Sequence, residues 1–356
     1  MAEQLTAQRG ARLAWADVAR GAAMILVVFA HALQLMGVHD WNAGAFDTVN
    51  RYLTVLRMPL FFLVSGIFAA TAVQRSWRGL FASRLALLVY MYLLWSVVRA
   101  VWFSVVPWPL SETHPAVALL LAPVWPTTGL WFLYALVLFL LVAKATARFP
   151  AWAPLVLTGL VSVAAAYDVV PTGGNGVWRS VAMYAFFFLL GARLPHVWKA
   201  LADRATVVLA VVAAVAIPLS LVAFTLLPAV LRGAGRIGLS ALCVAACLVI
   251  AAAVARWGPL SRPLQYVGQR TIAVYVVHPL LLALLVPLLP AGSVPAVAAV
   301  VLFTALGVVL PLLLRRVLQG KSGVFDLPAP LARRLAPHAD RSPRPAASGP
   351  VSASGA

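Results

Sequence analysis

An arginine and a histidine bracket an apolar segment near the start of the chain. In "RGAAMILVVFAH" (residues 20–31), ten almost wholly apolar residues separate Arg20 from His31. In an α-helix, eleven steps of about 100° place both residues on one face, about 16 Å apart along the axis. A guanidinium can bind a phosphate or a carboxylate, and an imidazole can act as a base near neutral pH. The spacing therefore predicts an anion-binding group and a candidate base at two depths of one membrane helix.

Each of these two residues also has a structural interpretation. Asp17 lies three residues before Arg20, so the pair could simply anchor the helix at the membrane surface. His31 could simply form a hydrogen bond between helices. Ionisable residues at this depth are costly, however, and usually face a cavity. Both interpretations stay open at the level of the sequence.

Three more polar residues lie in the apolar segments that follow. Arg57 opens "RMPLFFLVSGIF" about one turn inside the expected outer boundary, and Ser65 lies at mid-depth in the same segment. Arg99 lies outward of the midplane, at a depth similar to that of His31. These positions predict a polar pocket that opens outward, with Arg57 and Ser65 as candidate substrate-binding residues. Alternatively, Ser65 packs against a neighbouring helix and Arg99 reaches a lipid phosphate.

Two further candidates for substrate binding come from later segments. His278 lies near the midplane of "YVGQRTIAVYVVHPLLL", where it could instead hydrogen-bond a carbonyl freed by Pro279. Tyr275 precedes His278 by three residues and shares its face, and Tyr134 is the polar side chain of "GLWFLYALVLF". The sequence contains no metal-ligand spacing, glycine-rich phosphate loop or G-x-S-x-G elbow, so no metal is expected.

The composition indicates which elements must position these residues. The chain has 356 residues, of which 63% are hydrophobic and 10% are charged, too few charges to cover a soluble domain. Long apolar runs recur, which predicts an all-α, polytopic integral membrane protein with about ten transmembrane helices. The expected spans are Asp17–Gly37, Leu53–Val73, Leu85–Val105, Thr127–Ala143, Trp152–Asp168, Val177–Arg193, Thr206–Leu227, Ile237–Arg256, Arg270–Leu289 and Val294–Arg315.

The positive charge is distributed unequally between the two sides of these spans. Of the 27 lysines and arginines, six fall in the outer half if the N-terminus is inside, and 21 fall on the cytoplasmic side. The positive-inside rule then predicts both termini in the cytoplasm and a place in the inner or plasma membrane. The net charge of +18 is thereby explained by topology, so nucleic acid is not an expected partner. The six outer residues are Arg51, Arg57, Arg99, Arg179, Arg232 and Arg236.

Three smaller features concern boundaries and cysteines. "AHA" at residues 30–32 resembles a signal-peptide cleavage site, but the apolar stretch continues beyond it. We expect a membrane domain at residues 1–322 and a disordered tail at 323–356, which is rich in Pro, Ala and Ser. Cys243 and Cys247 share one helix face and are predicted to be packing residues.

Several segments together resemble the membrane acyltransferase-3 family, in particular its fucose-4-O-acetylase-like and other stand-alone carbohydrate O-acetyltransferase members. The resemblance runs from about Leu13 to Leu318 and is carried by "DVARGAAMILVVFAH", "MPLFFLVSGIF", "GLWFLYAL", "FFFLLGARL" and "VGQRTIAVYVVHPLLL". It implies an enzyme that moves an acyl group, by resemblance acetyl, from cytoplasmic acetyl-CoA to a hydroxyl of an envelope or secreted glycan.

The resemblance also implies roles for particular residues. His31 matches the family's catalytic histidine, Arg20 matches its first-helix arginine, and Arg57 lies in its second-helix motif. Many members have two arginines leading into the third helix, whereas here Ser83 precedes the single Arg84. The contacts to the donor on that side therefore differ from the family pattern.

The chemistry of acyl transfer fits the remaining candidates. A hydroxyl nucleophile needs a base that works near neutral pH, which His31 could supply. Negative charge develops on the thioester carbonyl, and Arg99 or Arg57 could stabilise it. The donor carries phosphates, for which Arg20, Arg75, Arg78 and Arg84 are expected to form a cytoplasmic basic rim.

Two other classes of function are compatible with buried polar groups in ten spans. A secondary transporter of a small polar or anionic solute would also place a binding site near the midplane. Nine acidic residues offer few carboxylates for ion coupling, however, and paired broken helices are absent from the sequence pattern. A structural assembly factor would leave the buried arginines unexplained.

Overall fold

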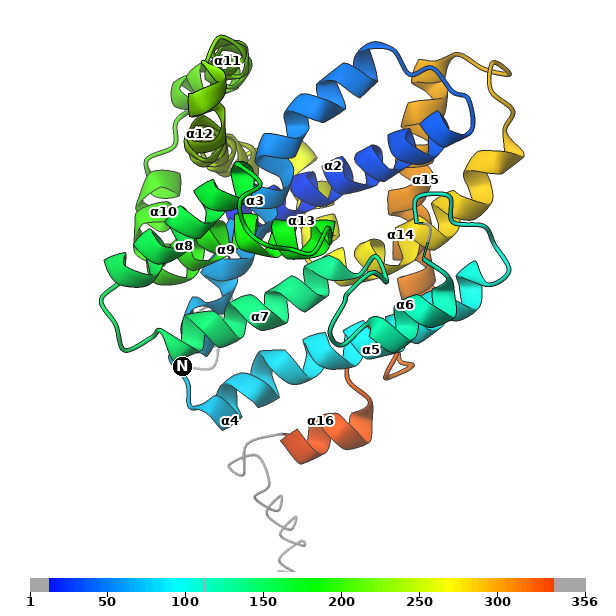
Figure 1. The fold of residues 1–356 in the computed structure, drawn as a ribbon, viewed down its shortest axis with the longest axis horizontal. Coiled ribbons are helices and arrows are strands. Elements are labelled where there is room, and N and C mark those ends of the chain that lie inside the picture. The colour runs from blue at the N-terminus through cyan, green and yellow to red at the C-terminus, as the bar shows by residue number, and fades with distance from the viewer. Residues whose placement is uncertain (1–12, 112, 336–356) are drawn as a thin grey trace, which may run out of the picture.

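The computed structural model describes residues 13–111 and 113–335, and the regular structure in these ranges is all helical (Figure 1). The helices are α2 (Ala14–Val38), α3 (Ala45–Val73), α4 (Trp77–Leu80), η1 (Phe81–Leu85, a π-helical turn), α5 (Ala86–Phe103), α6 (Pro115–Leu121), α7 (Trp131–Ala145), α8 (Trp152–Ala166), α9 (Gly176–Arg193), α10 (Pro195–Asp203), α11 (Val207–Thr225), α12 (Ala229–Ala255), α13 (Gly258–Gly268), α14 (Thr271–Leu285), η2 (Val286–Leu288, a 3-10 turn), α15 (Ala296–Val317) and α16 (Ala329–Leu335).

The lengths of these helices confirm a polytopic all-α membrane protein. In the described ranges, seven helical segments are long and apolar enough to cross a membrane: α2, α3, α4–α5, α11, α12, α14–η2 and α15. An eighth span results if α9 and α10, which are bent by 73°, count as one. Helices α7 and α8 are apolar but have 15 residues each, fewer than the roughly 20 that a full crossing needs. Each of the ten expected ranges contains a helix, while the number of crossings and their orientation remain predictions.

Helix α2, which carries Arg20 and His31, lies in the middle of the bundle. It packs against α3, α12, α13, α14 and α15 (Figure 1). We call its first residues the Arg20 end of the bundle and its last residues the His39 end. Asp17 is buried at the Arg20 end, where Gln269 Nε2 donates to its Oδ2 at 3.2 Å.

Glycines allow two pairs of helices to approach closely. A Cβ at Gly21 of α2 would meet the Leu264 carbonyl oxygen of α13, and a Cβ at Gly66 of α3 would meet that of Phe188 in α9. Gly191 of α9 faces the Leu63 carbonyl of α3 in the same way. Small residues of this kind permit backbone contact between membrane helices. The close packing that the sequence allowed for Ser65 is thus made by its neighbour, Gly66.

Basic side chains at the Arg20 end bind backbone carbonyls where helices finish. Lys144 Nζ donates to Val73 O at 3.0 Å, and Arg193 Nη2 donates to Thr146 O at 2.6 Å. Arg256 contacts carbonyls at the end of α10 in a similar manner. The last carbonyls of a helix lack internal donors, and a cation also complements the helix dipole there.

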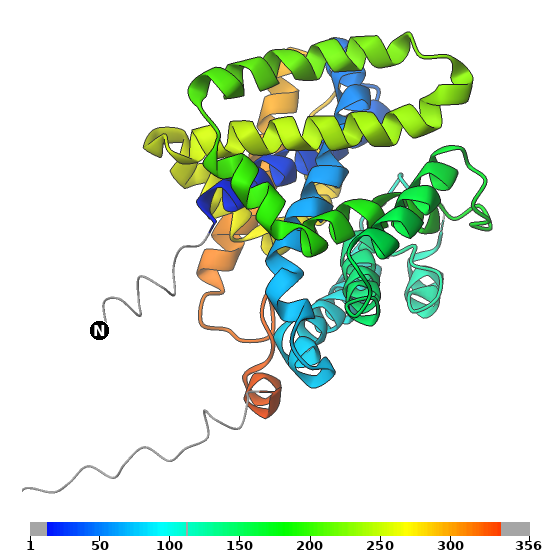
Figure 2. The same cartoon turned by 90° about the vertical axis from the view of Figure 1, so that its left-hand side faces the viewer.

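Helices α11 and α12 form an antiparallel pair on one side of the bundle (Figure 2). Most of the large apolar side chains of α11 are exposed, as expected of a face that contacts lipid. Cys243 of α12 is buried and Cys247 is partly buried, and both are free thiols.

The chain after α15 turns back onto α5, which differs from the expected start of a disordered tail at residue 323. Tyr90 Oη donates to Gly323 O at 2.7 Å, and Trp95 Nε1–H donates to Val324 O at 3.1 Å. Phe325 is buried and stacks on Trp95, with 5.6 Å between ring centroids. Residues 323–325 thus belong to the packed domain because they bring one large apolar side chain to it. Farther along the predicted tail, residues Ala329–Leu335 form helix α16, which has no buried residues, and residues 336–356 lie outside the described residues.

Candidate active site

A large cavity lies on the side of the bundle that His31 faces. We call it the His31 cavity; its volume is about 620 Å³. It is lined by residues from α2, α5, α14, the start of α7, the start of α9 and the loops before α7 and α9: His31, Gln34, Arg99, Trp108, Leu110, Ser111, Trp125, Pro126, Thr127, Gly129, Trp131, Gly173, Gly174, Asn175, Gly176, Val177, Ser180, Tyr275, His278 and Pro279. It therefore brings together His31, Arg99 and His278, three of the candidates from distant segments.

His31 and His278 form a hydrogen-bonded pair in this cavity. His31 Nδ1 lies 3.1 Å from His278 Nε2 and also 3.1 Å from the Val27 carbonyl oxygen. His278 Nδ1 lies 2.8 Å from the Val274 carbonyl oxygen. His278 is fully buried, whereas His31 is partly exposed to the cavity.

The hydrogen bonds assign the tautomers of the two neutral rings. A carbonyl oxygen can only accept, so His278 Nδ1 must carry the proton that it donates to Val274. His278 Nε2 is then the acceptor, and His31 Nδ1–H is the donor. The remaining nitrogen of His31, Nε2, is left with a lone pair. This arrangement is that of a base whose ring is oriented by a second group.

Arg99 is the buried cation of the His31 cavity. Its guanidinium lies over the rings of Phe103 and Trp108, 4.8 and 5.4 Å from their centroids. Its Nε–H donates to Thr128 O at 2.6 Å, while Nη1 is buried without a hydrogen-bond partner. Arg99 is only 4% exposed, so its charge is held in the protein rather than extended to a lipid phosphate.

Arg57 lies near this cavity but does not line it. It is partly buried on α3, and its Nη1 donates to Asn50 Oδ1 at 2.6 Å. Arg99 is the arginine that shares the lining of this cavity with His31.

A second, smaller cavity of about 110 Å³ lies toward the Arg20 end. Its walls are mostly apolar, and the polar groups among its lining are Arg20, Ser65, Arg84, Thr271 and Tyr275. Arg20 Nη2 donates to Thr271 Oγ1 at 2.9 Å, and Arg84 Nη2 donates to Phe68 O at 3.2 Å. We call it the Arg20 cavity.

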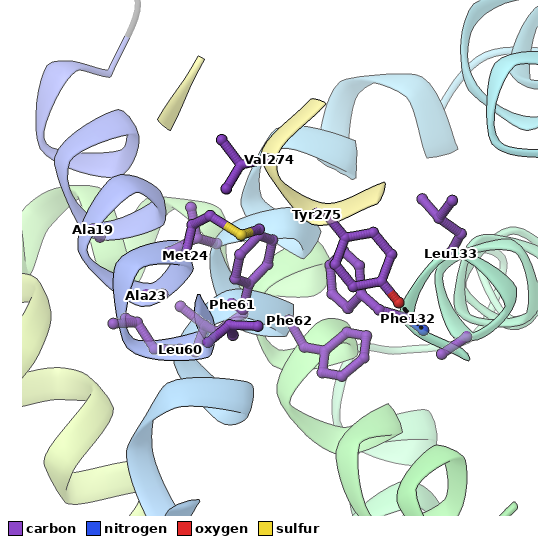
Figure 3. Close-up of a cluster of buried hydrophobic side chains, with 14 of the residues drawn as sticks. Ala19, Ala23, Met24, Leu60, Phe61, Phe62, Phe132, Leu133, Val274 and Tyr275 are labelled. Atoms are coloured by element: carbon purple, nitrogen blue, oxygen red, sulfur yellow. Dashed lines mark hydrogen bonds between the residues drawn. The ribbon is translucent and has the colours of Figure 1, made fainter. Parts of the chain in front are cut away.

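Tyr275 is the residue that lines both cavities. Its hydroxyl accepts a hydrogen bond from the Phe132 N–H at 3.2 Å and lies 3.4 Å from Gly129 O. Figure 3 shows the Tyr275 hydroxyl directed toward the Phe132 backbone, with Phe61 and Phe62 packed nearby. The side chain thereby forms a partition between the two cavities.

Other predicted residues lie away from the two cavities. Arg75 lies in the turn before α4 and Arg78 lies in α4; both are exposed and line neither cavity. Tyr134 donates to Pro123 O at 3.1 Å and packs beside Trp178. Ser65 lines the Arg20 cavity, on the opposite side of Tyr275 from His31.

Sequence reasoning missed three residues of the site. The sequence places Tyr275 on the face of His278, and Thr271 lies one turn before Tyr275. Neither position predicts that its side chain lines a cavity. Asn175 caps α9 by accepting from Val177 N–H at 2.8 Å, and its Nδ2 is buried without a partner. The "GGNG" run at 173–176 was the available signal, since such runs mark turns before helices.

Fold and site together define a class of protein: a polytopic membrane protein in which a histidine pair and a buried arginine meet in a cavity between helices. The chain matches the acyltransferase-3 domain family over residues 13–316. It therefore belongs to the acyltransferase-3 family and is a multi-pass membrane acyltransferase. No curated protein and no solved structure matches the chain. Family membership sets aside the transporter and assembly-factor alternatives.

Proposed function

We propose that the protein transfers an acetyl group from cytoplasmic acetyl-CoA to a hydroxyl of an envelope or secreted glycan. The donor binds at the Arg20 end and the acceptor enters the His31 cavity. The observation that carries this proposal is the His31–His278 hydrogen bond, because it leaves His31 Nε2 as an oriented base inside a cavity of about 620 Å³. That volume is sufficient for a sugar-sized group.

In the proposed reaction, His31 first activates the acceptor. Its Nε2 removes the proton of the sugar hydroxyl as the oxygen attacks the thioester carbonyl carbon. The resulting tetrahedral intermediate carries negative charge on the former carbonyl oxygen, which Arg99 in the cavity lining or Arg57 would stabilise. The carbon–sulfur bond then breaks, and the imidazolium returns its proton to the departing thiolate. The products are an acetyl ester and free coenzyme A.

The Arg20 cavity suits the other substrate. Arg20 and Arg84 provide cations for the donor phosphates, and the apolar walls suit the acyl-pantetheine arm. Arg75 and Arg78 remain available as an outer rim for the same phosphates. In this proposal the thioester reaches the acceptor beside Tyr275, where the two cavities meet.

The test is the His31→Ala variant. We expect normal membrane insertion, because the lost ring borders a polar cavity that water can fill. Acetylation should fall about a hundredfold or more, the usual contribution of a general base. In the parental protein the rate should rise with pH, because only the neutral imidazole accepts a proton.

The readout is mass spectrometry of envelope and secreted glycans from cells with the parental protein, with His31→Ala and without either. Each modified glycan should be lighter by one acetyl group in the last two strains. Near-parental acetylation by a properly inserted His31→Ala protein would remove the basis of the proposal.

A further inference from the structure

The His31 cavity carries positive charge that its described lining does not neutralise. Arg99 is 4% exposed, and its hydrogen-bonded partner is the neutral carbonyl of Thr128. Its aromatic neighbours, Phe103 and Trp108, are also neutral. None of the described residues that line the cavity is an aspartate or a glutamate. Among the described residues of the lining, this buried guanidinium has no counter-charge of the kind that such groups normally have.

A second feature of the same cavity also favours an anion. The first turn of α9, an 18-residue helix, lines the wall at residues 176 and 177, so the positive end of the helix dipole reaches the cavity. Asn175 uses its Oδ1 to cap this helix, while its Nδ2 is buried without a partner. Gly173 and Gly174 have φ of +59° and +80°, which lets the backbone turn beside the cavity.

We propose that the acceptor is an anionic sugar, whose carboxylate or phosphate pairs with Arg99 near the first turn of α9. This inference rests on the proposed function, since it concerns the substrate that His31 deprotonates. The anion would satisfy Arg99 Nη1 and provide an acceptor for Asn175 Nδ2, two donors that are otherwise buried and unpaired. The indoles of Trp108, Trp125 and Trp131 supply apolar faces for the sugar ring.

A binding experiment tests this inference without requiring catalysis. The thermal unfolding of the purified full-length protein is measured with methyl glucoside, methyl glucuronide or methyl glucoside 6-phosphate, with sodium chloride matching the ionic strength. Both anionic probes should raise the melting temperature more than the neutral one, since ligands that bind only the folded state stabilise it. The larger of the two rises distinguishes a carboxylate from a phosphate.

Variants assign the effect to the cavity. In Arg99→Gln, affinity for the better anionic probe should fall about tenfold or more, as expected for the loss of a charged hydrogen bond. Arg232→Gln is the matched control, because Arg232 is exposed, does not line the cavity and should leave the preference intact. Asn175→Ser keeps a capping side chain but removes the amide, so it should weaken anion binding even if Arg99→Gln does not fold.

Three results would overturn the inference. One is equal stabilisation by neutral and anionic probes, or none by any probe. Another is an unchanged anion preference in folded Arg99→Gln or, where that variant does not fold, in Asn175→Ser. A third is anion binding that is absent from the parental protein and present in Glu112→Gln. Glu112, which lies outside the described residues, would then be the counter-charge of the cavity. Acetylation by His31→Ala is measured separately, so failure of the proposed function is distinguishable from these results.

If Arg99 acted on the transition state alone, Arg99→Gln would slow acetylation of neutral and anionic acceptors alike.

Discussion

The paired imidazoles show how one residue can set the chemistry of another. His278 occupies its position through a bond from Nδ1 to the Val274 carbonyl, and this bond leaves Nε2 to hold His31. His278 does not need to touch either substrate to influence the reaction. Its effect on His31 is to fix the tautomer and the direction of the ring.

Replacing His278 should therefore lower turnover more than donor binding. In His278→Leu, His31 Nδ1–H loses His278 Nε2 and keeps only the Val27 carbonyl as an acceptor. The value of kcat should fall about tenfold or more, the equivalent of one lost hydrogen bond in a buried site. The KM for acetyl-CoA should stay near that of the parental protein. His278→Gln retains an acceptor oxygen and should recover part of the rate.

Stability must be followed in these variants because His278 is fully buried. A melting temperature that falls in both variants, with unchanged kcat in the folded fraction, would make His278 a packing residue.

Arg20 provides a second prediction at this scale. It lines the Arg20 cavity and is held by Thr271, whereas Arg78 is exposed and lines neither cavity. Arg20→Ala should weaken acetyl-CoA binding about tenfold or more, and Arg78→Ala should have a smaller effect. Isothermal titration calorimetry of the purified variants gives both constants. Equal affinities in Arg20→Ala and the parental protein would leave Arg20 as a structural residue alone.

At the scale of the elements, close helix contacts determine where the site residues lie. Arg57 and the Ser65–Gly66 pair all lie on α3, whose backbone touches α9 at Gly66 and Gly191. Helix α9 presents its first turn to the His31 cavity, whereas α3 contributes Ser65 to the Arg20 cavity. The α3–α9 contact therefore joins a wall of one cavity to a wall of the other.

Gly66→Ala should separate these two helices. The added Cβ would meet the Phe188 carbonyl, and backbone cannot move aside as a flexible side chain can. We expect a loss of about 1–3 kcal/mol in stability, the usual cost of overpacking. Gly238→Ala on α12 is the matched control, since nothing lies within 4 Å of its Cβ position and alanine favours helix. A thermal unfolding series in detergent compares them, and similar melting temperatures would show that the α3–α9 contact can relax.

The segment after α15 supplies a second prediction for an element. Truncation after Lys321 removes the two carbonyls that Tyr90 and Trp95 bind, together with the buried ring of Phe325. It should lower stability by about 2–4 kcal/mol, whereas truncation after Leu335 should be tolerated. Comparison of the membrane levels and melting temperatures of the two proteins checks this. If the protein truncated after Lys321 has the membrane level and melting temperature of the parental protein, residue 323 would again be the start of a dispensable tail.

At the scale of the whole molecule, the two cavities lie on opposite sides of Tyr275 and toward opposite ends of α2. A donor and an acceptor on different sides of a membrane fit this division. The proposed assignment of sides rests on charge, because six of the 27 lysines and arginines fall on the side expected to face outward.

Reporter fusions can determine the orientation. Fusions after Gly37, Val73 and Ser322 should read outside, inside and inside, if α2 begins in the cytoplasm and ten segments cross. An outside signal after Ser322 would mean an odd number of crossings, which is incompatible with ten. The 15-residue helices α7 and α8 are the first that such a result would question.

Part of this protein could be predicted from the sequence by itself. Apolar runs identify membrane helices because every backbone group in lipid must be bonded internally. Helical periodicity places Arg20 and His31 on one face because that relation depends on local geometry alone. The motifs in their order indicated the family, which the match over residues 13–316 confirms.

The tertiary structure decided which faces meet. Because apolar segments in a membrane offer similar surfaces on all sides, their periodicity does not specify a neighbour. The contact between His31 and His278, 247 residues apart, therefore had no local signal, nor did the separation of Ser65 from the His31 cavity. Tyr275 lies between the two cavities because ring contacts among α3, α7 and α14 hold its side chain there. These relations depend on side-chain shape across helices, which only the packed molecule determines.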